Sequence, residues 1–224
     1  MSDTRIFLAT LQRDLRLEFR TREALNAMFF YALLVIVIFS FAFSAETSII
    51  TRIGGGLLWV AFLFAGMVAL DRAFLREMME GSLSGIQIAP ASPSAIMAGK
   101  FASSFLLMLA MEAILLPLFA VLFNAPANTR WAGIIGVTIM GTWALAANGT
   151  YFSAMSTHAR QRSLLLPLLL LPVSIPAIIA MVQATQSYLS GNGDTGYWWK
   201  LLAGYDIIFT AIGWLLADIV IDVE

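Results

Sequence analysis

GGGLLWVAFLFAGMVALDRAFLREMMEGSLSGIQIAP, residues 54–90, decides the fold, because an apolar run of membrane-spanning length ends there in a cluster of charges. No charged residue lies between Gly54 and Leu70. The length of this run approaches the ~20 residues that a helix needs to cross a hydrocarbon core. Asp71 and Arg72 begin a segment in which charges alternate with large apolar side chains. The pattern predicts a transmembrane helix followed by a short helix at the membrane surface.

The composition extends this interpretation to the whole chain of 224 residues, of which 60% are hydrophobic and 12% charged. A water-soluble domain needs a much larger charged surface. Backbone groups in lipid must be satisfied within their own segment, so the apolar runs are expected to be helices. We therefore predict an all-α integral membrane protein with six transmembrane helices, near residues 27–45, 54–71, 101–123, 131–156, 164–186 and 201–221.

The basic residues between these spans predict the orientation. Ten Lys and Arg residues fall on one side and three on the other, and cytoplasmic loops retain an excess of positive charge. Both termini are therefore expected in the cytoplasm. The aromatic cluster at residues 197–199 begins the last span on the opposite side, where amphipathic rings favour the membrane interface. The net charge of −1 gives no reason to expect a nucleic-acid partner.

Residues 1–26 have the periodicity of an amphipathic helix. Leu8, Leu11, Leu15 and Phe19 fall on one face, while arginines occupy another. Such a helix lies along the membrane surface, in contact with the lipid bilayer. The alternative is a solvated arm with no fixed structure.

The loop at residues 72–90 is the longest segment on the cytoplasmic side, and its mixed composition suits a short docked helix that contacts another protein. Arg76 and Glu80 stand one helical turn apart, and Gly81 permits the chain to reverse. Ser92 and Pro93 then have the residue types of an N-cap and a first helical position. The alternative is a solvated turn that only joins two spans.

Polar and helix-breaking residues inside the spans are candidates for function. Glu112 could line a polar path or pair with a cation of another subunit, or it could only bond a neighbouring helix. Pro167, Pro172 and Pro176 interrupt the hydrogen bonding of the fifth span, so we expect this span inside the bundle. Residues 177–200 could then include a re-entrant piece, the alternative being a merely kinked helix. Asp206 and Asp218 are interpreted as snorkelling or capping near the ends of the sixth span.

Enzyme signatures are missing from the sequence. It contains no G-x-x-x-x-G-K-[ST] motif for phosphates, no cysteine, and a single histidine, His158, on the cytoplasmic side. No catalytic residue, metal site or firmly bound cofactor is therefore predicted.

Two long segments carry a family resemblance. They are LLWVAFLFAGMVALDRAFLREMMEGSLSGIQIAPASPSAIMAGK, residues 57–100, and GTWALAANGTYFSAMSTHARQRSLLLPLLLLPVSIPAIIA, residues 141–180. Together they resemble the haem exporter B family, the membrane subunit of the cytochrome c maturation ABC system. The most specific parts are the motif at 70–72, the turn at 80–83, the pairs at 99–100 and 141–142, and the proline-rich run at 166–176.

The resemblance implies a bacterial inner-membrane permease of the ABC-2 exporter type, whose coupling helix between the second and third spans contacts a separate ATPase dimer. It also implies a second membrane half, expected to be another copy, together with a haem-handling membrane subunit and a periplasmic haem chaperone. Haem would be a transient substrate. We expect the ATPase contact at Arg76, Glu77, Glu80, Gly81 and Leu83, and a cavity or subunit contact at Glu112, Trp59, Trp143 and Pro172.

Three alternatives share many of these features: an exporter subunit for another lipophilic substrate, a secondary transporter, and a non-transporting membrane scaffold. A secondary transporter predicts broken helices in corresponding halves of the chain. Prolines here break chiefly the second half, which favours the ABC interpretation over that one.

Overall fold

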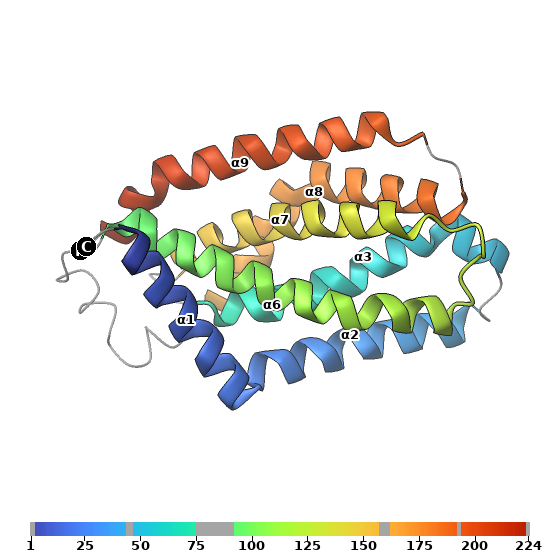
Figure 1. Ribbon diagram of the computed structural model, residues 1–224, viewed down its shortest axis with the longest axis horizontal. Coiled ribbons are helices and arrows are strands. Elements are labelled where there is room, and N and C mark those ends of the chain that lie inside the picture. The colour runs from blue at the N-terminus through green and yellow to red at the C-terminus, as the bar shows by residue number, and fades with distance from the viewer. Residues whose placement is uncertain (1–2, 44–46, 75–91, 157–161, 192–193, 223–224) are drawn as a thin grey trace.

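A computed structural model describes residues 3–43, 47–74, 92–156, 162–191 and 194–222, with the side chains of 47–49, 162–163 and 218–222 left out. The described residues form seven α-helices and no strand (Figure 1). The helices are α1 (Asp3–Thr21), α2 (Glu23–Ala42), α3 (Thr47–Arg72), α6 (Pro93–Leu122), α7 (Trp131–Ser156), α8 (Arg162–Leu189) and α9 (Gly196–Asp222).

Six of these helices, α2 to α9, are long and apolar enough to cross a membrane. The predicted all-α fold with six membrane helices is thus confirmed, and the chain is a multi-pass membrane protein. Ser92 is the N-cap of α6 and Pro93 its first residue, as the sequence predicted. The predicted coupling helix lies in residues 75–91, outside the described residues.

The centre of the bundle is formed by α3 and α7. Each helix has its own most apolar stretch of 18 residues. The buried share of that stretch is 61% in α3 and 56% in α7, but only 17% in α9. Helix α3 packs against α2, α6, α7 and α8. The remaining helices therefore surround a core pair, and α9 lies at the periphery (Figure 1).

Small residues on α7 allow α3 to approach closely. A Cβ atom added at Gly141 would overlap the indole of Trp59, and one added at Gly149 would overlap the Leu70 side chain. Ser153 donates a hydrogen bond of 2.7 Å to the Leu70 carbonyl. Such contacts matter in lipid, where packing and polar contacts replace the hydrophobic driving force between helices.

The triple glycine at residues 54–56 serves the packing of α3 on α8. A Cβ atom at Gly55 would lie 2.7 Å from the carbonyl oxygen of Val182. The Gly55 amide donates to Gln186 Oε1 at 2.9 Å, and the Gln186 amide group donates to the carbonyls of Ile50 and Thr51. The glycine run therefore supports a close helix contact.

The proline-rich helix α8 differs from the prediction. All three prolines lie within one continuous helix that extends to Leu189, so residues 177–189 are helical and the kinked-helix alternative was the better one. Pro172 and Pro176 are exposed, and 33% of the α8 apolar stretch is buried. The expectation of a span inside the bundle was wrong, because prolines on the outward face leave the inward face of α8 free to pack against α3 and α7.

Helix α1 meets α2 at Arg22, whose φ of 55° accompanies a change in the direction of the chain. The Glu18 carboxylate accepts the amide of Leu25 at 3.0 Å and so caps the first turn of α2. In Figure 1, α1 runs obliquely across the end of the bundle. Leu8 and Phe19, from the predicted apolar face, are exposed and available to lipid. The interfacial role of residues 1–26 stays a prediction.

The α3–α7 contact generates a stability prediction. Gly141→Leu should prevent the close approach of Trp59 and lower the free energy of unfolding by roughly 2–3 kcal/mol, as overpacking of a core does. Gly204→Leu is the matched control, because a Cβ atom at Gly204 meets nothing within 4 Å. Thermal unfolding of the two purified variants in one detergent measures the difference, and equal melting temperatures would contradict the packing argument.

Candidate functional site

A buried lysine joins three helices at the end of the bundle where α3 ends and α6 begins. Lys100, whose side chain is 3% exposed, lies 3.0 Å from the Asp14 carboxylate of α1. Its ammonium also donates to the carbonyl of Ala73 at 2.7 Å and lies 5.3 Å from the centre of the Phe74 ring. We call these four residues the Lys100 junction. It connects α1, α6 and the end of α3.

The contact between α1 and α6 has further polar supports. Ser103 lies one turn beyond Lys100 and donates to Asp14 at 3.4 Å, while Ser92 donates to Asp3 at 2.9 Å. Between them, Gly99 lets the Thr10 side chain approach the α6 backbone. Helix α1 is therefore attached to the membrane bundle along its length.

The predicted ATPase contact lies outside the described residues. Arg76, Glu77, Glu80, Gly81 and Leu83 all belong to residues 75–91, as does the predicted turn that they form. The last described residues before this segment are Ala73 and Phe74, which belong to the Lys100 junction. The segment thus begins directly at the point where three helices are held together.

Glu112 is the most deeply buried acid of the membrane helices described. It is 3% exposed, and its Oε2 accepts a hydrogen bond of 2.5 Å from Thr142 of α7. Its Oε1 has no hydrogen-bond partner. Burying a carboxyl group within a transmembrane helix costs free energy, and one of the two oxygens of Glu112 has no hydrogen bond to offset that cost. The bond to Thr142 supports the structural alternative, while the free oxygen leaves the functional one open.

The other three predicted intramembrane residues do not share one site. Trp59 is fully buried between α3, α7 and α8, and its indole N–H donates to Thr185 at 3.0 Å. Trp143 lies on another side of α7 and donates to Thr210 of α9 at 3.0 Å. Pro172 is exposed on α8. Trp59 is therefore a core residue. Glu112 and Trp143, in contrast, line a surface depression.

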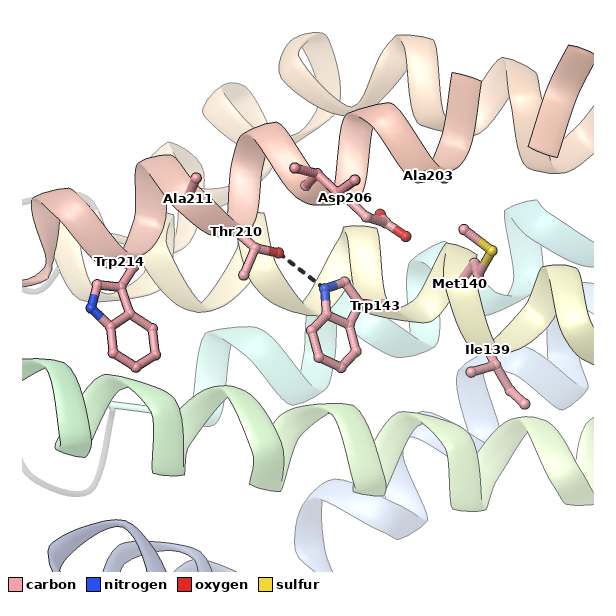
Figure 2. A pocket seen from close by; sticks show the side chains of 9 residues that line it. Ile139, Met140, Trp143, Ala203, Asp206, Thr210, Ala211 and Trp214 are labelled. Atoms are coloured by element: carbon pink, nitrogen blue, oxygen red, sulfur yellow. Dashed lines mark hydrogen bonds between the residues drawn. The ribbon is translucent and has the colours of Figure 1, made fainter. Parts of the chain in front are cut away.

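That depression is a groove floored by α7, with α6 and α9 as its walls. It consists of three adjoining hollows of about 590, 500 and 540 Å³. The first two share Trp143, and the first and third share Ile139. Figure 2 shows the first hollow, with Asp206 from α9 and Trp143 from α7 directed toward the space between α9 and α6. We call the three hollows together the lateral groove.

Asp206 does not cap its helix, as the sequence had suggested. Helix α9 begins at Gly196, ten residues before Asp206, so the carboxyl group is well inside the span. Its Oδ1 is buried and has no hydrogen-bond partner. The error came from placing the start of this span at residue 201. Asp218 belongs to the side chains that are not described.

Lys100 was not among the site residues predicted from the sequence. Its signal was a lysine that follows the predicted helix start at Pro93 by seven residues, just before the apolar run of α6. A cation there must find a partner before it enters lipid. The partner, Asp14, lies on a separate helix 86 residues earlier in the chain, so no local spacing could have identified it.

Together, six apolar helices, a polar junction at one end and a partly polar groove on one side define a multi-pass membrane protein. The chain belongs to the CcmB protein family, whose model matches residues 5–218. It is 33% identical to heme exporter protein B of Rhodobacter capsulatus over 76% of this chain and 78% of that protein. Heme exporter protein B of Pseudomonas aeruginosa is 29% identical over 86% of each chain. The Escherichia coli K12 protein of the same name is 29% identical over 89% of this chain and 91% of its own length.

The Lys100 junction predicts unequal effects of its two charges on stability. Asp14→Asn removes a carboxylate that lies 3.0 Å from a buried ammonium and should lower the free energy of unfolding by about 3 kcal/mol. Lys100→Met should cost less, because methionine fills the same apolar space and Asp14, 15% exposed, can regain water. Unfolding in detergent measures both, with Lys200→Met as an exposed control. An Asp14→Asn variant as stable as that control would argue against the ion pair.

Proposed function

We propose that this chain is the membrane permease subunit of an ABC transporter complex in cytochrome c biogenesis. A partner ATPase would hydrolyse ATP, and the energy would drive haem export or the release of a haem-loaded chaperone. Membership of the CcmB family and similarity to proteins named heme exporter protein B support the haem assignment. Haem is a transient substrate in this proposal.

A separate ATPase is required because the sequence contains no phosphate-binding motif. The observation that carries the coupling proposal is the Lys100 junction. Residues 75–91 begin next to Ala73 and Phe74, which contact Lys100, and Lys100 contacts Asp14. A force applied to this segment would therefore reach α3, α6 and α1 together. Closure of the ATPase dimer is a rigid-body movement of the kind that such a junction can transmit.

The proposed complex contains an ATPase dimer, a second copy of this chain, a haem-handling membrane subunit and a periplasmic haem chaperone. Its location is the bacterial inner membrane, with both termini in the cytoplasm. Ten Lys and Arg residues fall on the predicted cytoplasmic side and three on the other side, which supports this orientation. The Lys100 junction and residues 75–91 then lie on the ATPase side, as coupling requires.

Single cysteines can test the orientation, because the natural sequence contains none. Cysteines replacing Ser48, Asn128 or Gly193 should react with a membrane-impermeant thiol reagent added to intact cells from the periplasmic side. Cysteines replacing Ser84 or Arg160 should react only after the membrane is opened. Labelling at position 84 before opening would overturn the orientation.

The coupling proposal predicts a specific effect of charge reversal. Glu80→Lys should weaken co-purification of the ATPase, or uncouple its hydrolysis, while membrane insertion stays normal, because a reversed charge at the rim of an interface disfavours docking. The predicted result is a strong loss of c-type cytochromes in cells that depend on the variant. Glu46→Lys, the same reversal on the opposite predicted side, should leave assembly intact. Normal ATPase binding and normal cytochrome formation in Glu80→Lys would refute this contact.

A further inference from the structure

Among the described residues, most of the buried side-chain oxygens without a hydrogen-bond partner belong to residues that line the lateral groove. Among the described residues, six buried side-chain oxygens have no hydrogen-bond partner. Four of them belong to residues that line this groove: Glu112, Thr138, Thr150 and Asp206. Buried polar groups are normally paired, so a concentration of unpaired ones in one surface depression needs an explanation.

The shape of the groove resembles that of a helix-binding site. Its lining extends along α7 from Trp131 to Tyr151. The 20 steps between these two residues span about 30 Å at ~1.5 Å per residue, which is the thickness of the hydrocarbon core. The walls are otherwise apolar, so lipid chains could fill the groove. They could not satisfy the four oxygens, because acyl chains carry no hydrogen-bond donor.

A second copy of this chain is a poor occupant. A two-fold contact through the groove would bring Glu112 and Asp206 of one copy toward the same residues of the other. The chain could not neutralise these acids, because residues 101–129, 131–157 and 201–224 contain no lysine, arginine or histidine. The occupant must therefore supply a cationic side chain, which these three segments of the chain lack.

We propose that the lateral groove binds a transmembrane helix of a different polypeptide, which carries a cationic side chain opposite Glu112 and Asp206. This inference goes beyond the proposed function, since it does not depend on the identity of the substrate. Each unpaired oxygen is covered in the present structure. Docking must then include a rotation of the Glu112 or Asp206 side chain toward the incoming donor.

Photocrosslinking in native membranes tests the proposal. A benzophenone amino acid replaces Ile139, which borders two of the hollows, or Ile207 on the α9 wall. Ile38 on α2, 54% exposed and outside the groove, is the control position. The expected result is an adduct with one and the same membrane polypeptide at 139 and 207 and none at 38. Peptide mapping should place the link within about one helical turn of a Lys, Arg or His in a transmembrane segment.

Substitution of the two acids then tests the polar contact. In Glu112→Gln the amide oxygen can keep the bond to Thr142, while the new NH₂ group replaces the unpaired acceptor by a donor. Combined with Asp206→Asn, it should lower the crosslink yield at least about tenfold. The melting temperature of the purified subunit should not fall, because the replaced oxygens make no bond within the chain. Adducts with lipid alone or with a second copy, an unchanged yield in the double variant, or a lower melting temperature would each overturn the proposal.

Discussion

A buried charge at the membrane boundary must be paired, and the contact between Lys100 and Asp14 meets this requirement by joining α1 to α6. The same ammonium binds the Ala73 carbonyl and so holds the end of α3. Helix α3 is in turn the helix against which α2, α6, α7 and α8 pack. The arrangement of the central bundle therefore depends on a polar contact at one end and on close apolar packing along its length.

The apolar packing relies on residues that let backbones approach. Gly141 receives the Trp59 ring, and Gly55 admits the α8 backbone, where Gln186 completes the hydrogen bonding of the α3 backbone. Since lipid competes equally well for apolar side chains, these small residues and polar contacts provide the specificity of the core. In the described part of the chain, four residues that line the lateral groove instead carry buried side-chain oxygens without a hydrogen-bond partner.

Much of the fold could be predicted from the sequence, because apolar length and loop charge are local properties. Six membrane helices and the start of α6 at Pro93 both followed from such patterns. The position of α8 could not be predicted in this way. A proline indicates that a backbone hydrogen bond is missing, but the sequence does not show whether the proline faces the bundle or its surroundings. The Lys100 junction and the pairing of Glu112 with Thr142 depend on contacts between distant segments, so spacing could not reveal them. The predicted ATPase contact remains a prediction.

The central claim is that the Lys100 junction transmits nucleotide-driven movement to the membrane helices. Spin labels on cysteines replacing Arg20 at the end of α1 and Ala127 in the loop between α6 and α7 would measure this movement, in a complex reconstituted with the partner ATPase. A non-hydrolysable ATP analogue should shift the distance between the labels in the otherwise natural chain. The shift should be lost in Asp14→Asn while the ATPase stays bound. No shift in the natural chain, or an equal shift in Asp14→Asn, would contradict the claim.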